Sequence, residues 1–211
     1  MEPREHWQAV YSRKAPDEVS WFQREPRLSL ELIGRSPNVP RDVLDVGGGA
    51  STLVDALLHT GSDRITVLDL APAALASARA RLGPDGERVG WIAADILNAP
   101  LADQSVDVWH DRAVFHFLVA PHERQGYVDQ VRRLVRPGGQ VLVATFAEDG
   151  PTRCSGLEVA RYSSRALHAT FGPGFELVAS RREDHLTPSG AHQAFTYCLC
   201  VWDGGIAQHA A

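Results

Sequence analysis

Acidic residues and glycines occur together near the end of one short apolar run. Asp45 precedes the three consecutive glycines Gly47, Gly48 and Gly49, and Asp69 follows Gly47 by 22 positions. Glycine lets the backbone turn tightly and lets a ligand approach the main chain closely. The start of the helix that follows favours a negatively charged group such as a ligand carboxylate. An acid at the end of the next strand can accept hydrogen bonds from two ribose hydroxyls. The pattern therefore indicates an adenosine-binding site.

Two details of this turn distinguish the adenosine cofactors from one another. The dinucleotide pattern GxGxxG requires glycine at position 52, which is Thr52 in this chain. Asp45 would also repel a pyrophosphate, whereas it can bind the ammonium group of a methionyl moiety. No GK[ST] follows the glycines, so the phosphate-binding P-loop pattern is absent from the sequence. The turn therefore favours a methionine-bearing cofactor over a nicotinamide dinucleotide.

Two histidines flank the exit of a fourth apolar run. Ligands of parallel sheets bind beyond the carboxyl ends of the strands, so His110 and His116 are expected near the site. Imidazole titrates near neutral pH, and we predict His116 as a base that takes a proton from the methyl acceptor. The alternative is a packed, hydrogen-bonded histidine between Phe115 and Phe117.

Further candidates for the acceptor pocket follow the fifth apolar run. Cys154 beside Arg153 could present a thiolate that binds a soft metalloid. That chemistry ordinarily needs several converging cysteines. Arg161 and Tyr162 are predicted to line the acceptor pocket. The aromatic residues of the N-terminal segment are expected either to form its core or to close over a positively charged sulfonium group; these are Trp7, Tyr11 and Trp21.

Apolar runs and helical patterns alternate from about residue 41 onward, which is typical of βαβ units and a parallel sheet. Residues 1–40 differ, because aromatic residues lie among charges there, and we expect a helical lid. The predicted strands are 42–46, 64–70, 89–94, 106–109 and 140–146, and a final hairpin pairs 175–185 with 194–202. The predicted helices are 27–33, 51–59, 72–82, 121–135 and one around 164–171.

Five segments resemble, in order and spacing, the motifs of class I S-adenosylmethionine-dependent methyltransferases. They are VLDVGGGAS (43–51), VLDL (67–70), AADIL (93–97), DVWHDRAVFHFL (107–118) and LVRPGGQVLVATF (134–146). The resemblance implies an α/β, Rossmann-like, doubly wound sheet of seven strands in the order 3-2-1-4-5-7-6, with the last strand antiparallel. A core of residues 41–146 would bind the cofactor, and residues 147–211 would supply a substrate-side loop, a helix and the hairpin.

The same resemblance assigns roles to individual residues. Asp45, Gly47, Gly48 and Gly49 would hold the methionine end of S-adenosylmethionine. Trp21, which the resemblance does not assign, is added to the cofactor-binding residues as the aromatic side chain that could close over the sulfonium. Asp69 would bind the ribose, with Leu70 beside the adenine. Asp95 would accept from the adenine amino group while the backbone of Ile96 contacts the ring, and capping of a helix is the alternative for Asp95. Asp111 and Arg112 would face the methionine part and the acceptor, with Asp111 also a candidate for catalysis.

Length, charge and cysteine content limit the partners, the metal sites and the cellular compartment that we expect for this chain. The chain has 211 residues, a formal net charge of −5 and three cysteines without CxxC spacing. This argues against a nucleic-acid partner, a disulfide framework and a metal site, and it fits a reducing cytoplasm. No apolar run approaches the length that crosses a bilayer. We expect one domain, as a monomer or a homodimer.

The expected activity is methyl transfer by in-line displacement, most readily to a small molecule. Three alternatives remain open at this stage. The acceptor could be a protein lysine, because Asp111 follows the fourth strand as in some lysine methyltransferases, although Arg112-Ala113 replaces their usual lysine-glycine. The chain could also act on a metalloid or thiol through Cys154, or bind the cofactor without turnover.

Overall fold

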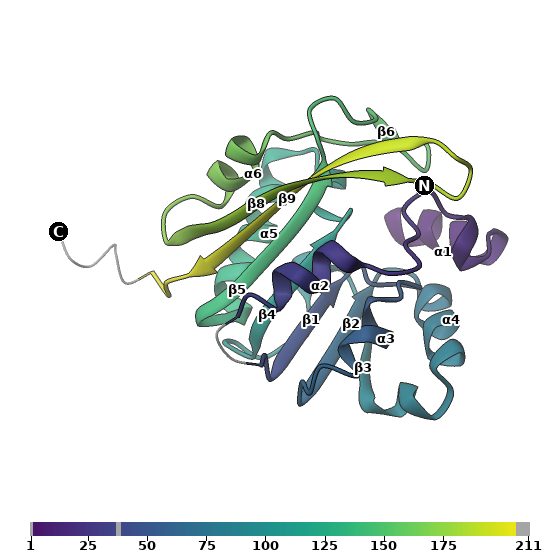
Figure 1. Ribbon diagram of the computed structural model, residues 1–211, viewed down its shortest axis with the longest axis horizontal. Coiled ribbons are helices and arrows are strands. Elements are labelled where there is room, and N and C mark those ends of the chain that lie inside the picture. Colours follow the sequence, from purple (N-terminus) through teal and green to yellow (C-terminus); the bar gives the residue numbers. More distant parts are fainter. Residues whose placement is uncertain (1, 37–38, 206–211) are drawn as a thin grey trace.

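A seven-stranded sheet forms the centre of the computed structural model, which describes residues 2–36 and 39–205. The strand order is β3-β2-β1-β4-β5-β9-β8 (Figure 1). Strands β1 to β5 are parallel to one another, and β9 runs antiparallel to β5 and β8. Counted along the sheet-forming strands, this is the predicted order 3-2-1-4-5-7-6 with its last strand antiparallel. The strands are β1 Asp42–Val46, β2 Arg64–Asp69, β3 Val89–Ala93, β4 Val106–Arg112, β5 Val135–Phe146, β8 Phe175–Leu186 and β9 His192–Trp202.

Helices cover both faces of this sheet. Successive side chains of a strand point to opposite faces, so both faces of a buried parallel strand must be apolar. In β5, for example, Leu142 joins one apolar cluster, whereas Val141 and Val143 join the other. Helices α2, α3 and α4 pack on the first cluster, and α5 and α6 pack on the second (Figure 1). The helices are α1 Pro3–Arg13, α2 Arg27–Ile33, α3 Leu53–Leu57, α4 Pro72–Leu82, α5 Pro121–Leu134 and α6 Ser164–Phe171.

Helix α1 and the segment after it lie at the carboxyl ends of β2 and β3. The Gln8 side-chain oxygen accepts from the Ala73 amide at the start of α4 (3.1 Å), and Arg4 donates to the Ala93 carbonyl at the end of β3 (3.3 Å). No residue of α1 is fully buried. The N-terminal segment is therefore helical, as predicted, and it sits above the edge of the sheet where parallel strands place ligands.

Several predicted boundaries are wrong by two to five residues. The strand expected over 140–146 begins at Val135, so it includes the Pro137-Gly138-Gly139 segment that was expected to precede it. The helix expected over 51–59 spans only Leu53–Leu57, because the Ser51 hydroxyl accepts from the Leu53 amide and holds the preceding residues in a turn. The strand expected over 106–109 continues to Arg112. Its last three residues are polar, a pattern that indicates a strand end, but they pair with β1 or β5 inside the sheet.

A buried polar chain ties the end of β4 to helix α5. The Trp109 indole donates to the Tyr127 hydroxyl (2.8 Å), which donates to Asp111 Oδ2 (2.6 Å). Asp111 also accepts from the amides of Val114 and Phe115. Burial raises the pKa of the Asp111 carboxyl to about 6 despite these donors. The carboxylate thus fixes the turn that leaves β4.

Substituting Tyr127→Phe should lower the free energy of unfolding by about 1–3 kcal/mol, because it removes one donor from a buried carboxylate and leaves the Trp109 indole N–H without its acceptor. Denaturant unfolding monitored by circular dichroism measures the loss. Tyr162→Phe is the matched control, since that ring packs against Phe115 in the same cluster and its hydroxyl makes no hydrogen bond within residues 2–36 and 39–205. Equal losses in the two variants would contradict the polar chain.

Candidate active site

A cavity of about 360 Å³ opens at the carboxyl ends of β1, β2, β3 and β4. This volume lies in the range of pockets that hold small organic ligands. Its wall comes from the glycine turn, the ends of β2 and β3, the turn after β4, the N-terminal segment and a short hairpin of β6 (Arg153–Cys154) and β7 (Leu157–Glu158). Its polar and charged lining residues are Asp69, Asp95, Arg112, Glu123, Cys154 and Glu158, beside the aromatic residues Trp7, Tyr11, Trp21 and Phe117.

The glycine turn leaves no room for side chains. Gly47 and Gly49 adopt φ values of +64° and +43°, in the left-handed region that favours glycine. A Cβ at Gly47 would overlap the Val114 side chain, and one at Gly48 would overlap the Asp45 carboxylate. Only glycine at these positions keeps the backbone close to both neighbours. The turn can therefore present main-chain groups directly to a ligand.

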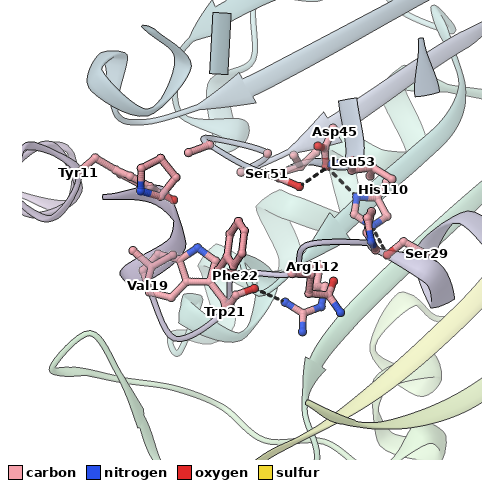
Figure 2. A pocket seen from close by; sticks show the side chains of 17 residues that line it. Tyr11, Val19, Trp21, Phe22, Ser29, Asp45, Ser51, Leu53, His110 and Arg112 are labelled. Atoms are coloured by element: carbon pink, nitrogen blue, oxygen red, sulfur yellow. Dashed lines mark hydrogen bonds and ion pairs between the residues drawn. The ribbon is translucent and has the colours of Figure 1, made fainter. Parts of the chain in front are cut away.

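A hydrogen bond from His110 on β4 holds the Asp45 carboxylate in place (Figure 2). His110 Nδ1 lies 2.7 Å from Asp45 Oδ1, and its Nε2 lies 2.9 Å from the Ser29 hydroxyl on α2. With Nδ1 donating to the carboxylate, a neutral ring accepts at Nε2. The other carboxylate oxygen, Oδ2, is buried and has no hydrogen-bond partner among the described residues. It borders a recess of about 40 Å³ that Gly47, Gly48 and Trp21 also line. A buried carboxylate oxygen without a donor favours a cationic ligand group.

Asp69 ends β2 beneath the N-terminal segment. Its Oδ1 accepts from the Ala71 amide (2.7 Å), and burial raises the pKa of the carboxyl to about 7. The same burial, with the nearby Asp69 charge, raises the pKa of the Tyr11 phenol. Asp69 Oδ2 and the Tyr11 hydroxyl both lie close to Gly49. The carboxylate is thus positioned between the glycine turn and the cavity.

The adenine-side residues also line the cavity. Leu70 and Ile96 supply apolar surface at the ends of β2 and β3, and Asp95 lies between them. Asp95 Oδ1 accepts from the Leu97 amide (2.9 Å) and caps a short 3₁₀ turn. Both roles considered for this residue therefore have a geometric basis, because a carboxylate has further acceptor capacity.

Arg112 joins three parts of the chain at the cavity. Its guanidinium donates to the Trp21 carbonyl (3.0 Å), the Tyr197 hydroxyl (2.8 Å) and Glu183 Oε2 (3.1 Å). It also lies over the Phe195 ring, 4.1 Å from the centroid. Its side chain is 8% exposed. The donors of Arg112 are therefore largely committed to protein partners, which makes it a tie between the N-terminal segment and the terminal hairpin.

Four aromatic residues pack on one another along one side of the cavity. Trp7 packs edge-to-face on Trp21 (5.7 Å between centroids) and on Phe117 (5.0 Å), and Tyr11 packs on Trp21 (6.2 Å). All four line the cavity. The N-terminal aromatic residues were expected either to form a core or to close over a sulfonium group. They pack on one another and also line the cavity, so their positions are compatible with both roles. Phe117 was not singled out from the sequence, although it lies in the motif that leaves β4.

The two residues predicted to be catalytic lie outside the cavity, and both expectations are corrected here. Asp111 is fully buried and points toward Tyr127 on α5. His116 is also fully buried, and it packs on Phe117 and Phe146. Burial, with the nearby Arg112 charge, lowers the pKa of His116 to about 3. A neutral imidazole enclosed in the core is not placed to take a proton from an acceptor.

The predicted acceptor residues are also largely displaced. Arg161 is exposed and donates to the Gly150 carbonyl (3.1 Å), and Tyr162 is buried against Phe115; neither lines the cavity. Cys154 does line it, but burial raises the pKa of its thiol to about 11. It is therefore a neutral thiol at physiological pH, not a thiolate beside Arg153.

Within residues 2–36 and 39–205, no three histidine, cysteine or acidic side chains gather closely enough to hold a metal ion. In the same ranges, no helix is both long and apolar enough to cross a membrane. The remaining cysteines, Cys198 and Cys200, are buried together on β9 with 3.4 Å between their sulfur atoms.

Known proteins share both the sequence pattern and the fold. Residues 43–139 match the family described as "Methyltransferase domain". The ubiquinone biosynthesis O-methyltransferase of Bordetella avium is 30% identical over 83% of this chain and 70% of that protein. A ubiquinone/menaquinone biosynthesis C-methyltransferase of Paracoccus denitrificans is 31% identical over 52% of this chain, which spans only 45% of that relative.

A solved structure supports the same assignment of the fold. The 1,6-didemethyltoxoflavin-N1-methyltransferase of Burkholderia thailandensis, with 1,6-didemethyltoxoflavin and S-adenosylhomocysteine bound, superposes with a TM-score of 0.73 at 22% identity. The match covers 94% of this chain and 86% of that one. The chain belongs to the class I S-adenosylmethionine-dependent methyltransferases. The cofactor of this family is S-adenosylmethionine, whose demethylated product is S-adenosylhomocysteine.

The substitution Gly48→Ala tests the glycine turn. The added methyl group would displace the Asp45 carboxylate and press on Val67, so the affinity for S-adenosylhomocysteine should fall by at least about tenfold, or about 1.4 kcal/mol. Isothermal titration calorimetry measures this change. Gly126→Ala on α5 is the matched control, because its Cβ would make only ordinary contact with Leu97. Unchanged affinity in Gly48→Ala would remove the turn from the binding site.

Proposed function

We propose that this chain transfers a methyl group from S-adenosylmethionine to a small molecule held in the 360 Å³ cavity. One observation supports the proposal above all others: a single cavity joins Gly47 and Asp69 to the aromatic wall of the N-terminal segment. Donor and acceptor can therefore occupy adjoining parts of one space. The segment of residues 1–40 and the loop of residues 148–162 would act together as a lid over them.

The residues of the site fit this cofactor. Asp45 Oδ2 has no donor from the described residues and borders a recess of about 40 Å³, so it can take the methionyl ammonium group. The glycine turn would approach the methionine end, and Asp69 would accept from the ribose hydroxyls. Leu70, Asp95 and Ile96 would surround the adenine. Trp21 lines both the recess and the cavity, where its ring can face the sulfonium.

When bound, S-adenosylmethionine supplies an electrophilic methyl carbon on a positively charged sulfur. The contribution of the chain is to align the acceptor with that carbon and to exclude water. Arg112 holds the backbone of the N-terminal segment at Trp21. Asp111 holds the turn after β4, which forms another part of the cavity wall. The hydrophobic side chains of Trp7, Phe117 and Leu118 in the lining would limit the access of water to the reacting methyl group. Positioning is therefore the main catalytic effect that we assign to these residues.

Cofactor affinity should rise with pH around neutrality. The pKa of Asp69 is raised to about 7, so only about a tenth of it is ionised at pH 6 and about nine tenths at pH 8. Ribose hydroxyls donate more strongly to the carboxylate than to the neutral acid. The dissociation constant of S-adenosylhomocysteine should therefore fall by up to about tenfold from pH 6 to pH 8.

Calorimetry of Asp69→Asn should show weaker binding with this pH dependence removed. Asp95→Asn is the control, because it lies on the adenine side and should weaken binding without changing the slope. A slope that persists in Asp69→Asn would show that another group is responsible.

Transfer of labelled methyl groups to a panel of small acceptors tests the proposed function directly. Phenols, thiols, amines and lysine-bearing peptides should be compared with cofactor binding measured in parallel. Transfer to a small molecule is the expected result. Transfer only to the peptides would favour the protein-lysine alternative, and binding without any turnover would favour a cofactor-binding module.

A further inference from the structure

The acceptor side of the cavity can be separated from the cofactor side by the elements that line it. The cofactor side consists of the ends of β1, β2 and β3. The remaining lining, which we call the acceptor wall, comes from the N-terminal segment, the end of β4 with the turn after it, the start of α5 and the β6–β7 hairpin. Besides apolar residues, the side chains of this wall that can select a ligand by charge, hydrogen bonding or ring contact are Trp7, Tyr11, Trp21, Arg112, Phe117, Glu123, Cys154 and Glu158.

The wall offers little positive charge to a ligand. Arg112 is the only lysine or arginine that lines the cavity among the described residues, and it is paired with Glu183 at 3.1 Å. Its guanidinium also donates to Tyr197 and to the Trp21 carbonyl. A carboxylate or phosphate on an acceptor would have to compete with these partners for the same donors. Such acceptors are therefore disfavoured by the arrangement around Arg112.

The wall does offer negative charge and aromatic surface. Glu158 lies on β7 next to Leu157, which lines the same cavity, and its side chain makes no hydrogen bond or ion pair within residues 2–36 and 39–205. Glu123 uses one carboxylate oxygen to accept from the Ala120 amide and retains the other. Cys154 is a neutral thiol, because burial raises its pKa to about 11. Aromatic walls beside a carboxylate attract cations.

We propose that the acceptor is a small hydrophobic or aromatic amine, which binds as its ammonium form with the charge toward Glu158. This inference rests on the proposed methyltransferase function and specifies its substrate class. The ring or alkyl body would lie against Trp7, Trp21 and Phe117. Glu158 is then a specificity-determining residue, which distinguishes an amine from an acid or an alcohol of the same shape.

The reaction of such an acceptor balances without a further reactant. The ammonium group first releases one proton to water, which gives a neutral amine with a free electron pair. That pair forms the new N–C bond to the methyl carbon, while the S–C bond breaks and its electron pair stays on sulfur. The products are the N-methylated ammonium ion, neutral S-adenosylhomocysteine and the proton already released.

A free amine fits the enclosure better than a lysine on a folded protein. The acceptor wall includes helix α1, which bonds to Ala73 at the start of α4 and to Ala93 at the end of β3, and the β6–β7 hairpin. A free amine can lie within this enclosure, whereas a lysine on a folded protein would have to bring its own backbone past both elements. Peptides therefore serve only as an arm of the test.

Matched ligands test the inference on the full chain saturated with S-adenosylhomocysteine. Calorimetry should compare phenethylamine and tryptamine with phenylacetate and indole-3-acetate, and with the neutral alcohols 2-phenylethanol and tryptophol. We expect each amine to bind at least about tenfold more tightly than the matched acid. Glu158→Gln should weaken amine binding by about three- to tenfold and leave the alcohols unchanged. Glu176→Gln, an exposed glutamate on β8 outside the cavity, should change none of them.

Several results would overturn the inference while the proposed function stands. These are acids that bind as tightly as the amines, no amine binding to a protein that binds S-adenosylhomocysteine, or equal effects of Glu158→Gln on amines and alcohols. A lysine-bearing peptide that binds as tightly as the free amines would overturn the restriction to small molecules. Absence of S-adenosylhomocysteine binding would instead reject the proposed function itself.

Discussion

The shape of the site depends on the hydrogen bonds and the ion pair of Arg112 at the end of β4. Arg112 is nearly buried, and it carries a full charge into a part of the molecule that holds Phe195 and Trp21. Burying a charge costs several kcal/mol unless it is paired and hydrogen-bonded. Glu183 and Tyr197 on the terminal hairpin supply those partners, and the Trp21 carbonyl supplies another. One guanidinium therefore fixes the N-terminal segment, which lines the cavity, to the β8–β9 hairpin.

Three aspartates near the ends of adjacent strands show how local partners give the same side chain different uses. Asp111 faces α5 and is satisfied by Tyr127 and two amides, so it stabilises the fold. Asp45 is half satisfied by His110 and keeps one buried oxygen without a partner. Asp69 accepts from Ala71 and borders the cavity. The difference follows from which face of the sheet each side chain occupies and from the donors that happen to lie there.

Apolar periodicity and local motifs in the sequence predicted most elements and the cavity-lining glycines of the turn, and the resemblance to the methyltransferase family implied the order of the strands. The sequence did not predict the orientation of Asp111 or the burial of His116. Both lie in the turn after β4, where spacing places a residue near the site but does not say which way it points. His116 faces Phe146 on β5, a contact across 30 positions of the chain that no local pattern records. Glu158 was missed for the same reason, since the short β6–β7 hairpin that holds it has no clear strand pattern.

Helix α1 has a consequence for the order of events at the site. It has no fully buried residue, and the hydrogen bonds that join it to the sheet edge run through the side chains of Arg4 and Gln8. Segments with so little burial open at a small fraction of the free energy of global unfolding. Trp7 and Tyr11 on this helix line the ligand cavity, so exchange of bound molecules and local opening of α1 draw on the same contacts. A ligand in the cavity should therefore slow hydrogen exchange of the α1 amides. Release of the demethylated product, which needs the same opening, can limit the rate of the catalytic cycle.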